Sequence, residues 1–533
     1  MRRPGRLKGI ARGIAKSFAV LVVGATLVFL LNRVAGLPDN SDRTVSELLS
    51  ANVGSRIERG IEPLVAAHPG ETGLYELPLG LDAFAARVVL MRQADHSIDT
   101  QYYMWHQDVV GRFLVHELID AANRGVRVRL LVDDMYGSDG EETWLAMDAH
   151  PNIEVRLFAP YSRRQPKVLQ FLTRFHEVNA RMHTKTLTVD NVATVVGGRN
   201  IGDEYFGANT ELEFADNDVL AVGATAREVA GVFNDYWNAD YAYSVSRLLE
   251  PADQSDLEQL DISAFAFRNR EDVARYVDAV EKSSFANALR DFSLAFQWGE
   301  SEIVHDPWWK RDSSRPGWKD ALLISGLKQH ILAAEREVII VSPYFVPDPD
   351  VADALCAKAQ SGMPVRVLTN SLASNDVVAV HAGYSKYRRQ LLECGVELFE
   401  LNEHLRAEQR KSFSWLGNLE KSSLHAKTMI FDREKMFVGS FNLDQRSLYL
   451  NTEIGLVFEQ PKIARQAAES FVANIRNVAF EVELVGDDGG ARSLRWQSME
   501  NGEVISLTSE PYVGLGTKAA VSFMRLFPVN WLL

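Results

Sequence analysis

The chain has 533 residues, 46% hydrophobic and 24% charged, a composition typical of globular proteins and a length that predicts at least two domains. Its formal net charge of −14 argues against a nucleic-acid partner, because such affinity depends on clustered Lys and Arg. An anionic lipid is not excluded, since local basic patches can oppose the overall charge. The two cysteines, Cys356 and Cys394, suit neither a disulfide framework nor a zinc site, and we expect buried free thiols.

The N-terminal stretch 1–37 predicts a membrane anchor. Six basic residues precede an unbroken run of 14 small and apolar residues at 18–31. That run is shorter than the roughly 20 residues that span hydrocarbon, but with its flanks the stretch is long enough. A cleaved signal peptide is the alternative, although no clean Ala-x-Ala site ends the run. The basic residues before it place the N-terminus in the cytoplasm and the rest of the chain outside.

The next segments predict a linker and then an α/β half. Residues 38–74 are expected to form a polar linker with a short helix. From 75 to 243 strand-like and helix-like stretches alternate, which is typical of a sheet with buried strands. Five basic residues are interleaved with apolar ones within 159–181. This amphipathic stretch either lies on anionic headgroups or packs on the domain. Asp216 and Asp218 either frame a pocket or end a strand, and the structural role is favoured.

The second part of the chain repeats this order. A connecting segment at 244–320 contains three tryptophans at 306–318, which either meet a membrane interface or, as we favour, pack on the body. Residues 321–485 form the second half, in which His381 follows the carboxyl end of a strand, where α/β sites form. The extension at 486–533 ends in an apolar tail that either docks on the body or, as favoured, dips into lipid.

One pattern occurs twice, 242 residues apart. The copies are His183-x-Lys185-x4-Asp190-x6-Gly197-Gly198-x-Asn200 and His425-x-Lys427-x4-Asp432-x6-Gly439-Ser440-x-Asn442. The same offset relates Glu211 to Glu453, each 28 residues after its histidine. A lone His-x-Lys pair carries no information, whereas a long pattern repeated at one offset predicts a functional site.

The residue types in the pattern suit chemistry at phosphorus. On a strand, His and Lys at i and i+2 share a face. Histidine acts as nucleophile or general acid near neutral pH, and lysine and asparagine bind phosphate oxygens. The candidate catalytic residues are His183, Lys185, His425, Lys427, Asp190, Asp432, Glu211 and Glu453, and the candidate phosphate-binding residues are Asn200, Asn442, Gly198 and Ser440.

Within this set, we interpret the two aspartates as turn residues with a mainly structural role, following short strands in a hairpin. Glu211 and Glu453 are expected to orient the imidazoles, as the acid does in a Ser-His-Asp triad. The spacing provides no set of metal ligands, so we expect no metal and no cofactor.

The two motifs resemble those of the phospholipase D superfamily. Six further segments resemble the bacterial cardiolipin synthase C group, and the similarity covers roughly 60–533; the segments are 98–105, 125–134, 197–206, 370–377, 381–384 and 527–533. The resemblance implies an α/β fold with two pseudo-symmetric phospholipase D-like halves at 75–243 and 321–485, each a mixed sheet flanked by helices, after an N-terminal transmembrane or signal-anchor helix. One active site is expected at their seam.

The resemblance also implies an activity. It is that of a phosphatidyltransferase making cardiolipin from phosphatidylglycerol and a second phospholipid, phosphatidylethanolamine by likeness to the group, through a phosphohistidine. One imidazole attacks phosphorus while the other donates a proton, and by likeness to relatives His183 is taken as the nucleophile. A phospholipase D hydrolysing lipids to phosphatidic acid is the alternative; a nuclease and a membrane scaffold are weaker ones. The expected location is the bacterial inner (cell) membrane, with the catalytic bulk on the extracytoplasmic side and any accessory protein undetermined.

Overall fold

The computed structural model describes residues 36–49, 54–208, 213–375, 377–402, 423–486, 492–500 and 502–525, with Trp415 and scattered positions between 16 and 26. Within these residues no helix has both the length and the apolar character needed to cross a bilayer. The predicted anchor at 1–37 lies almost wholly outside the described residues, as does the end of the tail at 526–533.

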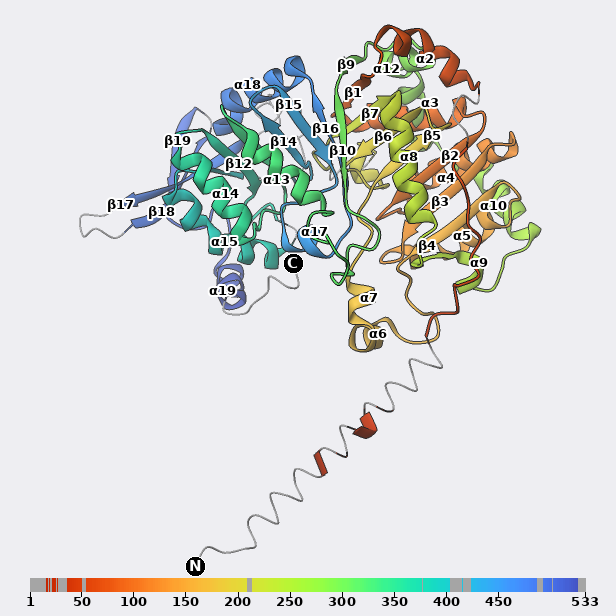
Figure 1. The fold of residues 1–533 in the computed structure, drawn as a ribbon, viewed down its shortest axis with the longest axis horizontal. Helices are drawn as coiled ribbons and strands as arrows, with labels where there is room; N and C mark the ends of the chain where they lie inside the picture. Colours follow the sequence, from red (N-terminus) through yellow and green to blue (C-terminus); the bar gives the residue numbers. More distant parts are fainter. Residues whose placement is uncertain are drawn as a thin grey trace, which may run out of the picture.

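The first half is built on a nine-stranded mixed sheet (Figure 1). Its strand order is β8-β4-β3-β2-β5-β6-β7-β1-β9, with β2, β3 and β4 parallel and the other pairs antiparallel. The strands are β1 Thr72–Leu77, β2 Ser97–Tyr102, β3 Arg127–Asp133, β4 Ile153–Phe158, β5 Thr186–Val189, β6 Ala193–Gly197, β7 Asp218–Val222, β8 Ala242–Ser244 and β9 Gln297–Gly299. The main helices of this half are α2 Arg56–Ala67, α3 Gly80–Gln93, α4 Val109–Asn123, α5 Glu141–Asp148, α6 Lys167–Thr173, α7 Phe175–Asn179 and α8 Ala224–Trp237.

The second half repeats the same arrangement in a ten-stranded sheet of order β10-β16-β15-β14-β11-β12-β13-β17-β18-β19. Its strands are β10 Ser301–His305, β11 Val338–Val341, β12 Val365–Asn370, β13 Glu397–Leu401, β14 Thr428–Phe431, β15 Lys435–Gly439, β16 Ile454–Glu459, β17 Ala479–Gly486, β18 Arg492–Glu500 and β19 Glu503–Leu507. Its main helices are α13 Leu323–Ala333, α14 Pro349–Gln360, α15 Val378–Glu393, α17 Gln445–Tyr449, α18 Pro461–Val478 and α19 Leu515–Met524. The predicted α/β class with two mixed sheets is confirmed.

Each motif lies on a hairpin, as its sequence predicts. The turn between β5 and β6 has positive φ at Asp190 (50°) and Asn191 (59°), and the turn between β14 and β15 has φ of 58° at both Asp432 and Arg433. Asp and Asn tolerate this left-handed conformation better than most residues. The first strand of each hairpin, β5 or β14, is buried along its whole length, so both of its faces are covered.

The two halves share one core. Val196 and Val219 of the first half belong to the same buried apolar cluster as Val438 and Leu456 of the second. Figure 1 shows the two sheets side by side with helices over their outer faces. The connecting segment reinforces the junction, because its strand β9 pairs in the first sheet and β10 in the second.

The cysteines do not behave as predicted. Cys356 of α14 and Cys394, directly after α15, form a disulfide, so the expectation of two free thiols was wrong. The two helices pack against each other and bring the Cα atoms within 5.3 Å, the spacing that a disulfide requires. Two cysteines 38 residues apart in separate helices give no such indication in sequence.

Candidate active site

Both motif histidines lie at the seam, and each is held by an acid from the opposite half. His183 Nδ1 is 2.9 Å from Glu453 Oε2, and His425 Nδ1 is 2.5 Å from Asp216 Oδ2. All four side chains are almost fully buried. Because the Nδ1 atoms face the carboxylates, the Nε2 atoms are the ones directed to a reacting group.

Short backbone pairings between the halves create these two contacts. Met182 bridges Thr452, and Ala215 bridges Leu424, both in parallel orientation. His183 N donates to Thr452 O at 2.9 Å, and His425 N donates to Ala215 O at 2.8 Å. Each pairing therefore places an acid, the residue that follows Thr452 or Ala215, beside the histidine of the other half.

Asp216 is thus the structural counterpart of Glu453, a role that the sequence pattern gave to Glu211. The strand register shows why. Gly197 pairs with Asp218, 21 residues later, whereas Gly439 pairs with Gly455, only 16 residues later, so the first half has five more residues before its acid. The constant offset therefore fails after the asparagine of the motif. Glu211 itself lies outside the described residues, and the structural reading of Asp216 was wrong. Asp218 does have a structural role, in a buried ion pair with Arg87 at 2.8 Å.

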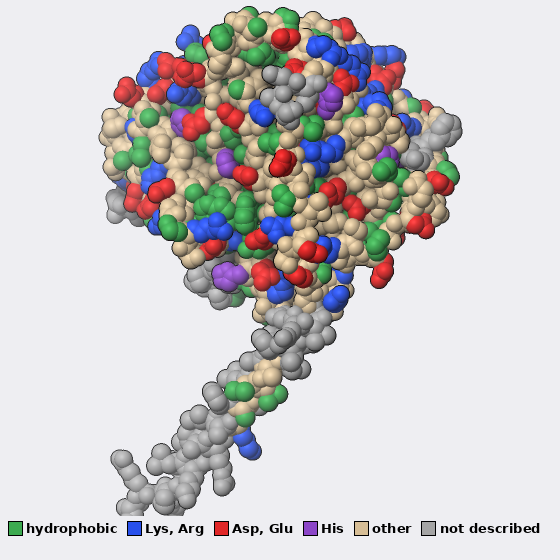
Figure 2. All heavy atoms as spheres, turned by 45° about the vertical axis from the view of Figure 1, so that its right-hand side comes forward, with side chains coloured by type: hydrophobic (Ala, Val, Ile, Leu, Met, Phe, Trp, Pro, Cys, Tyr) green, Lys and Arg blue, Asp and Glu red, His purple; other side chains and the backbone are tan. Residues whose placement is uncertain are grey.

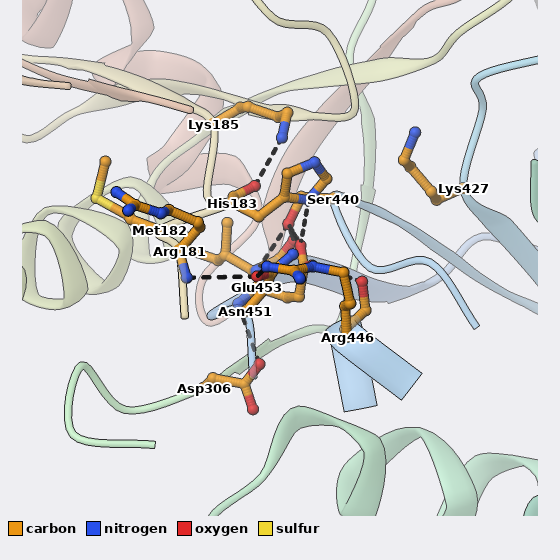
Figure 3. A network of polar contacts seen from close by, with 12 residues as sticks. Arg181, Met182, His183, Lys185, Asp306, Lys427, Ser440, Arg446, Asn451 and Glu453 are labelled. Atoms are coloured by element: carbon orange, nitrogen blue, oxygen red, sulfur yellow. Dashed lines mark hydrogen bonds and ion pairs between the residues drawn. The ribbon is translucent and has the colours of Figure 1, made fainter. Parts of the chain in front are cut away.

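Glu453 is the more heavily supported acid (Figure 3). Its Oε2 accepts from Ser440 Oγ at 2.5 Å and its Oε1 from Ser447 Oγ at 2.7 Å. Its backbone N donates to Asp306 Oδ2 at 3.0 Å, and the same oxygen accepts from the buried Lys310 Nζ at 2.7 Å. Asp306 and Lys310 belong to the Trp-rich stretch 306–318, so that stretch is packed under the site, in agreement with the favoured prediction.

The difference between Gly198 and Ser440 follows from how the two acids are held. A Cβ at Gly198 would lie 2.2 Å from Asp216 Oδ1, so this position must be glycine to leave room for the carboxylate. At the equivalent position Ser440 instead donates its hydroxyl to Glu453. Arg199, buried next to Gly198, donates to Asp216 O at 2.6 Å and fixes the acid-bearing segment.

The motif lysines and asparagines also lie at the seam. Lys185 Nζ donates to His183 O at 2.7 Å, and Lys427 Nζ lies 3.0 Å from His425 Nδ1. Asn200 Nδ2 donates to Tyr205 OH at 3.0 Å. Among the residues that the structure describes, the buried Oδ1 atoms of Asn200 and Asn442 have no hydrogen-bond partner. Cations and amide groups of this kind suit the binding of an anion.

Asp190 and Asp432 lie in the two hairpin turns, where their carboxylates accept hydrogen bonds from backbone amides. Asp190 accepts hydrogen bonds from the backbone N of residues 95, 96 and 97, and Asp432 from those of residues 335, 336 and 337. Each is seven residues along an extended strand and turn from its histidine, about 20 Å at roughly 3.3 Å per residue. Their interpretation as turn residues agrees with this geometry, and their place in the catalytic set stays a prediction.

The electrostatics differ between the two imidazoles. Burial, Lys185 and Lys427 hold the pKa of His183 well below its ordinary value. Burial and Lys427 also lower the pKa of His425, but Asp216 opposes the shift. Burial raises the pKa of Glu453 to about 7, whereas for Asp216 the nearby His425 and Lys427 outweigh burial and lower its pKa.

Aromatic side chains that the sequence did not single out border both imidazoles. Tyr103 meets His183 edge-on with ring centroids 4.9 Å apart, and Tyr205 meets His425 in the same way at 5.3 Å. Phe214 lies 5.4 Å from His425. These rings restrict the imidazole orientations and exclude water. His381, by contrast, contacts Arg388 at 2.9 Å in a separate buried cluster.

Comparison with known proteins agrees with this geometry. The family model described as "Cardiolipin synthase, PLD-like domain" matches residues 88–237 and 327–475. Cardiolipin synthase C of Escherichia coli (strain K12) is 37% identical over 478 residues, covering 90% of this chain and 100% of that protein. Cardiolipin synthase of Geobacillus kaustophilus (strain HTA426) is 26% identical over 402 residues, covering 75% and 66%.

A solved structure shows the same fold at low identity. Phosphatidylserine synthase of Haemophilus influenzae Rd KW20 superposes with a TM-score of 0.53 at 12% identity, covering 90% of this chain and 100% of that one. With one family match in each half and a relative aligned over its whole length, the chain belongs to the phospholipase D superfamily and, within it, to the cardiolipin synthase family.

Proposed function

We propose that the protein is a phosphatidyltransferase that makes cardiolipin from phosphatidylglycerol and a second phospholipid. The observation that carries the proposal is the pair of buried imidazoles at one seam, each oriented by an acid of the other half. The relationship to cardiolipin synthase C of Escherichia coli supports the substrate class.

The proposed reaction takes two steps. In the first, Nε2 of one histidine attacks the phosphorus of the donor lipid, and the bond between phosphorus and the headgroup oxygen breaks. The other histidine, protonated at this stage, gives that oxygen a proton. In the second, this imidazole removes the proton from a glycerol hydroxyl of phosphatidylglycerol. The resulting oxygen attacks the phosphohistidine, forms cardiolipin and releases the first histidine.

His183 is the proposed nucleophile. Its pKa lies well below the ordinary value, because burial and two lysines disfavour the imidazolium, so its Nε2 lone pair is available. His425 faces Asp216, whose pKa is lowered and which therefore carries a negative charge that supports a proton on His425. The two environments separate the roles of base and acid in the way that catalysis needs.

The cations and amides of the site serve the transition state. Lys185, Lys427, Asn200 and Asn442 are proposed to bind the equatorial phosphoryl oxygens, each well-placed donor contributing about 3 kcal/mol. Burial lowers the pKa of Lys185 to about 7. The negative charge of a bound phosphate diester favours the protonated form of the lysines.

The disulfide supports an extracytoplasmic position for the catalytic body. Disulfides persist in oxidising compartments and are rare in the reducing cytosol. The Cys356–Cys394 bond therefore fits the orientation expected from the basic N-terminus, with a single anchor in the bacterial inner membrane. The anchor itself remains part of the proposal.

Phosphatidylethanolamine is the proposed donor, by likeness to the cardiolipin synthase C group, and hydrolysis to phosphatidic acid is the competing outcome. The test uses the full chain reconstituted in vesicles of phosphatidylglycerol, with and without phosphatidylethanolamine, and mass spectrometry of the lipids. We expect cardiolipin and free ethanolamine from the mixed vesicles. Phosphatidic acid without cardiolipin would make the protein a phospholipase D.

Variants at the two histidines complete the test. His183→Ala and His425→Ala should abolish cardiolipin formation. His330→Ala, on α13 and paired with Glu302 at 3.1 Å, is the matched control and should leave it unchanged. Normal product from either seam variant would refute the mechanism.

A further inference from the structure

Two helices, one from each half, expose apolar side chains in a helical stripe. On α6, Val168 and Leu172 are 76% and 79% exposed and lie four residues apart. On α19, Leu515 and Phe523 are 85% and 62% exposed and lie eight residues apart. Spacings of four and eight place each pair on one side of its helix. Single exposed apolar residues are ordinary, but aligned exposed pairs on both halves are typical of a surface that binds something.

The charge around these stripes is opposite in sign to that of the whole protein. The chain carries a net charge of −14, yet neither α6 nor α19 contains an acidic residue. Arg164 and Lys167 directly precede the apolar pair of α6, and Arg525 follows α19, all three exposed. On the face drawn in Figure 2, acidic and basic side chains are interspersed. The two helices therefore match a surface that is apolar in depth and anionic at its rim.

Other basic residues of the stretch before the first motif are used for packing. Arg163 pairs with Asp134 and Glu141, Arg174 pairs with Glu177, and Arg181 is buried beside Asp133. Of the five basic residues in the stretch predicted to be amphipathic at 159–181, Arg164, just before α6, and Lys167, at its start, thus remain exposed. This restricts the candidate contact to α6 itself.

Both helices lie at the end of the molecule where the described chain joins the body at Gly36 (Figure 1). Figure 1 shows α6, α7 and α19 at the lower end of the body. Gly36, where the continuous described chain begins, accepts a hydrogen bond from Ser162 Oγ at 3.3 Å, so the chain from the anchor meets the body beside α6. On the other half, Val521 of α19 packs on Leu372 and Ala382 at the start of α15.

The same end leads to the catalytic seam. His183 is four residues beyond the last residue of α7, a path of at most about 14 Å along the chain. Leu372, on which α19 packs, follows directly after β12, whose last residue Asn370 hydrogen-bonds Leu424 O next to His425. A surface that rested on both helices would therefore lie close to both motif histidines.

We propose that α6 and α19 form a two-point docking face that inserts its apolar side chains into an anionic lipid bilayer and holds the entrance of the seam against it. The choice of a bilayer as occupant rests on the proposed function and on the predicted anchor. The two contacts stand on opposite sides of the seam, so together they set the tilt of the body, which a single anchor leaves free.

Spin labels on the full chain test the docking directly. Labels at Leu172→Cys and Phe523→Cys, in vesicles containing phosphatidylglycerol, should be reached by dissolved oxygen and shielded from a water-soluble nickel reagent. Labels at Ile262→Cys and Val504→Cys are matched controls, because these residues are 73% and 66% exposed on α10 Gln254–Arg268 and on β19. They should remain in water. The native cysteines are joined in a disulfide and take no label.

Two readings would overturn the proposal. Labels at 172 and 523 that stay as exposed to the nickel reagent as the controls would show that the helices do not enter lipid. Labels that become immobilised without gaining access to oxygen would show that a protein, or a second copy of this chain, covers the helices.

Measurements of turnover distinguish a failure of the docking proposal from a failure of the proposed function. The pairs Val168→Ser with Leu172→Ser, and Leu515→Ser with Phe523→Ser, should each lower activity on vesicle lipids about tenfold. Activity on dispersed short-chain lipids should change less than about twofold, as should all activity of Ile262→Ser with Val504→Ser. Equal losses on both lipid forms would refute docking. Labels in lipid but no transferase activity in the unmodified chain would leave docking standing and refute the function.

Discussion

Replacing Asp216 by asparagine tests the structural assignment of the second acid. The substitution keeps the shape of the side chain and removes its charge. Asp216 is fully buried, and its Oδ2 is 2.5 Å from His425 Nδ1. Because burial and Lys427 already lower the pKa of His425, loss of the carboxylate leaves little to stabilise the imidazolium that donates the proton.

The size of the effect follows from the burial of the pair. Removing one partner of a buried ion pair costs about 3–5 kcal/mol. At about 1.4 kcal/mol for each factor of ten in rate, the expected fall in turnover is about 10²–10⁴-fold. Asp216→Asn should still fold, since the asparagine fits beside Gly198 and can accept a hydrogen bond, and its circular dichroism and melting curve check this.

The control is Glu211→Gln, at the position that the repeat offset gave to the acid. Initial rates of cardiolipin formation in mixed vesicles should fall less than about tenfold in this variant. A large loss of turnover in Glu211→Gln together with near-normal turnover in Asp216→Asn would refute the assignment of Asp216 as the acid that orients His425 and would favour Glu211 instead.

Three further predictions follow from features away from that pair. Asp190→Ala loses three hydrogen bonds from backbone amides to a carboxylate and should lower the free energy of unfolding by about 3 kcal/mol, measured by denaturant titration. Turnover per folded molecule should stay within about twofold of the unmodified protein. A loss of turnover without a loss of stability would show that Asp190 is catalytic. Cys356→Ser opens a loop of 38 residues and should cost about 4 kcal/mol of stability, an effect that reductant should reproduce in the unmodified protein. Burial raises the pKa of Glu453 to about 7, and the charges of Lys185 and Lys310 keep it from rising further. Lys310→Met removes one of these charges, so the pKa of Glu453 should rise and the acid limb of the pH–rate profile should move to higher pH. An unchanged acid limb would show that the ionisation of Glu453 does not control the rate.

The repeated motif predicted the architecture because it is local. His183 and Lys185 stand just before β5, and Asp190 stands at the turn that follows it, so their spacing reports the hairpin that each half builds. The hairpins depend on residues close in sequence, where strand and turn preferences act directly. The single seam with both histidines was instead expected from the resemblance to the phospholipase D superfamily.

The acid of the second pair was missed because its position depends on the other half. The carboxylate that reaches His425 is fixed by the bridge between Ala215 and Leu424, a contact between residues 209 apart. The first half has five more residues before its acid than the second half has. The constant offset of 242 residues therefore leads from Glu453 to Glu211, which is also an acid, rather than to Asp216. The disulfide was missed for a similar reason, since the packing of two helices decides whether two cysteines meet.

The exchange of acids between the halves also governs when the chain becomes able to act on lipid. Neither half contains both members of a histidine–acid pair, so a half that folds alone, as during synthesis or after proteolysis, has imidazoles without orienting carboxylates. Competence arises only when the second half docks and both crossed contacts close together. A partly made or broken molecule thereby lacks the oriented imidazoles that act on lipid, with no separate inhibitor required.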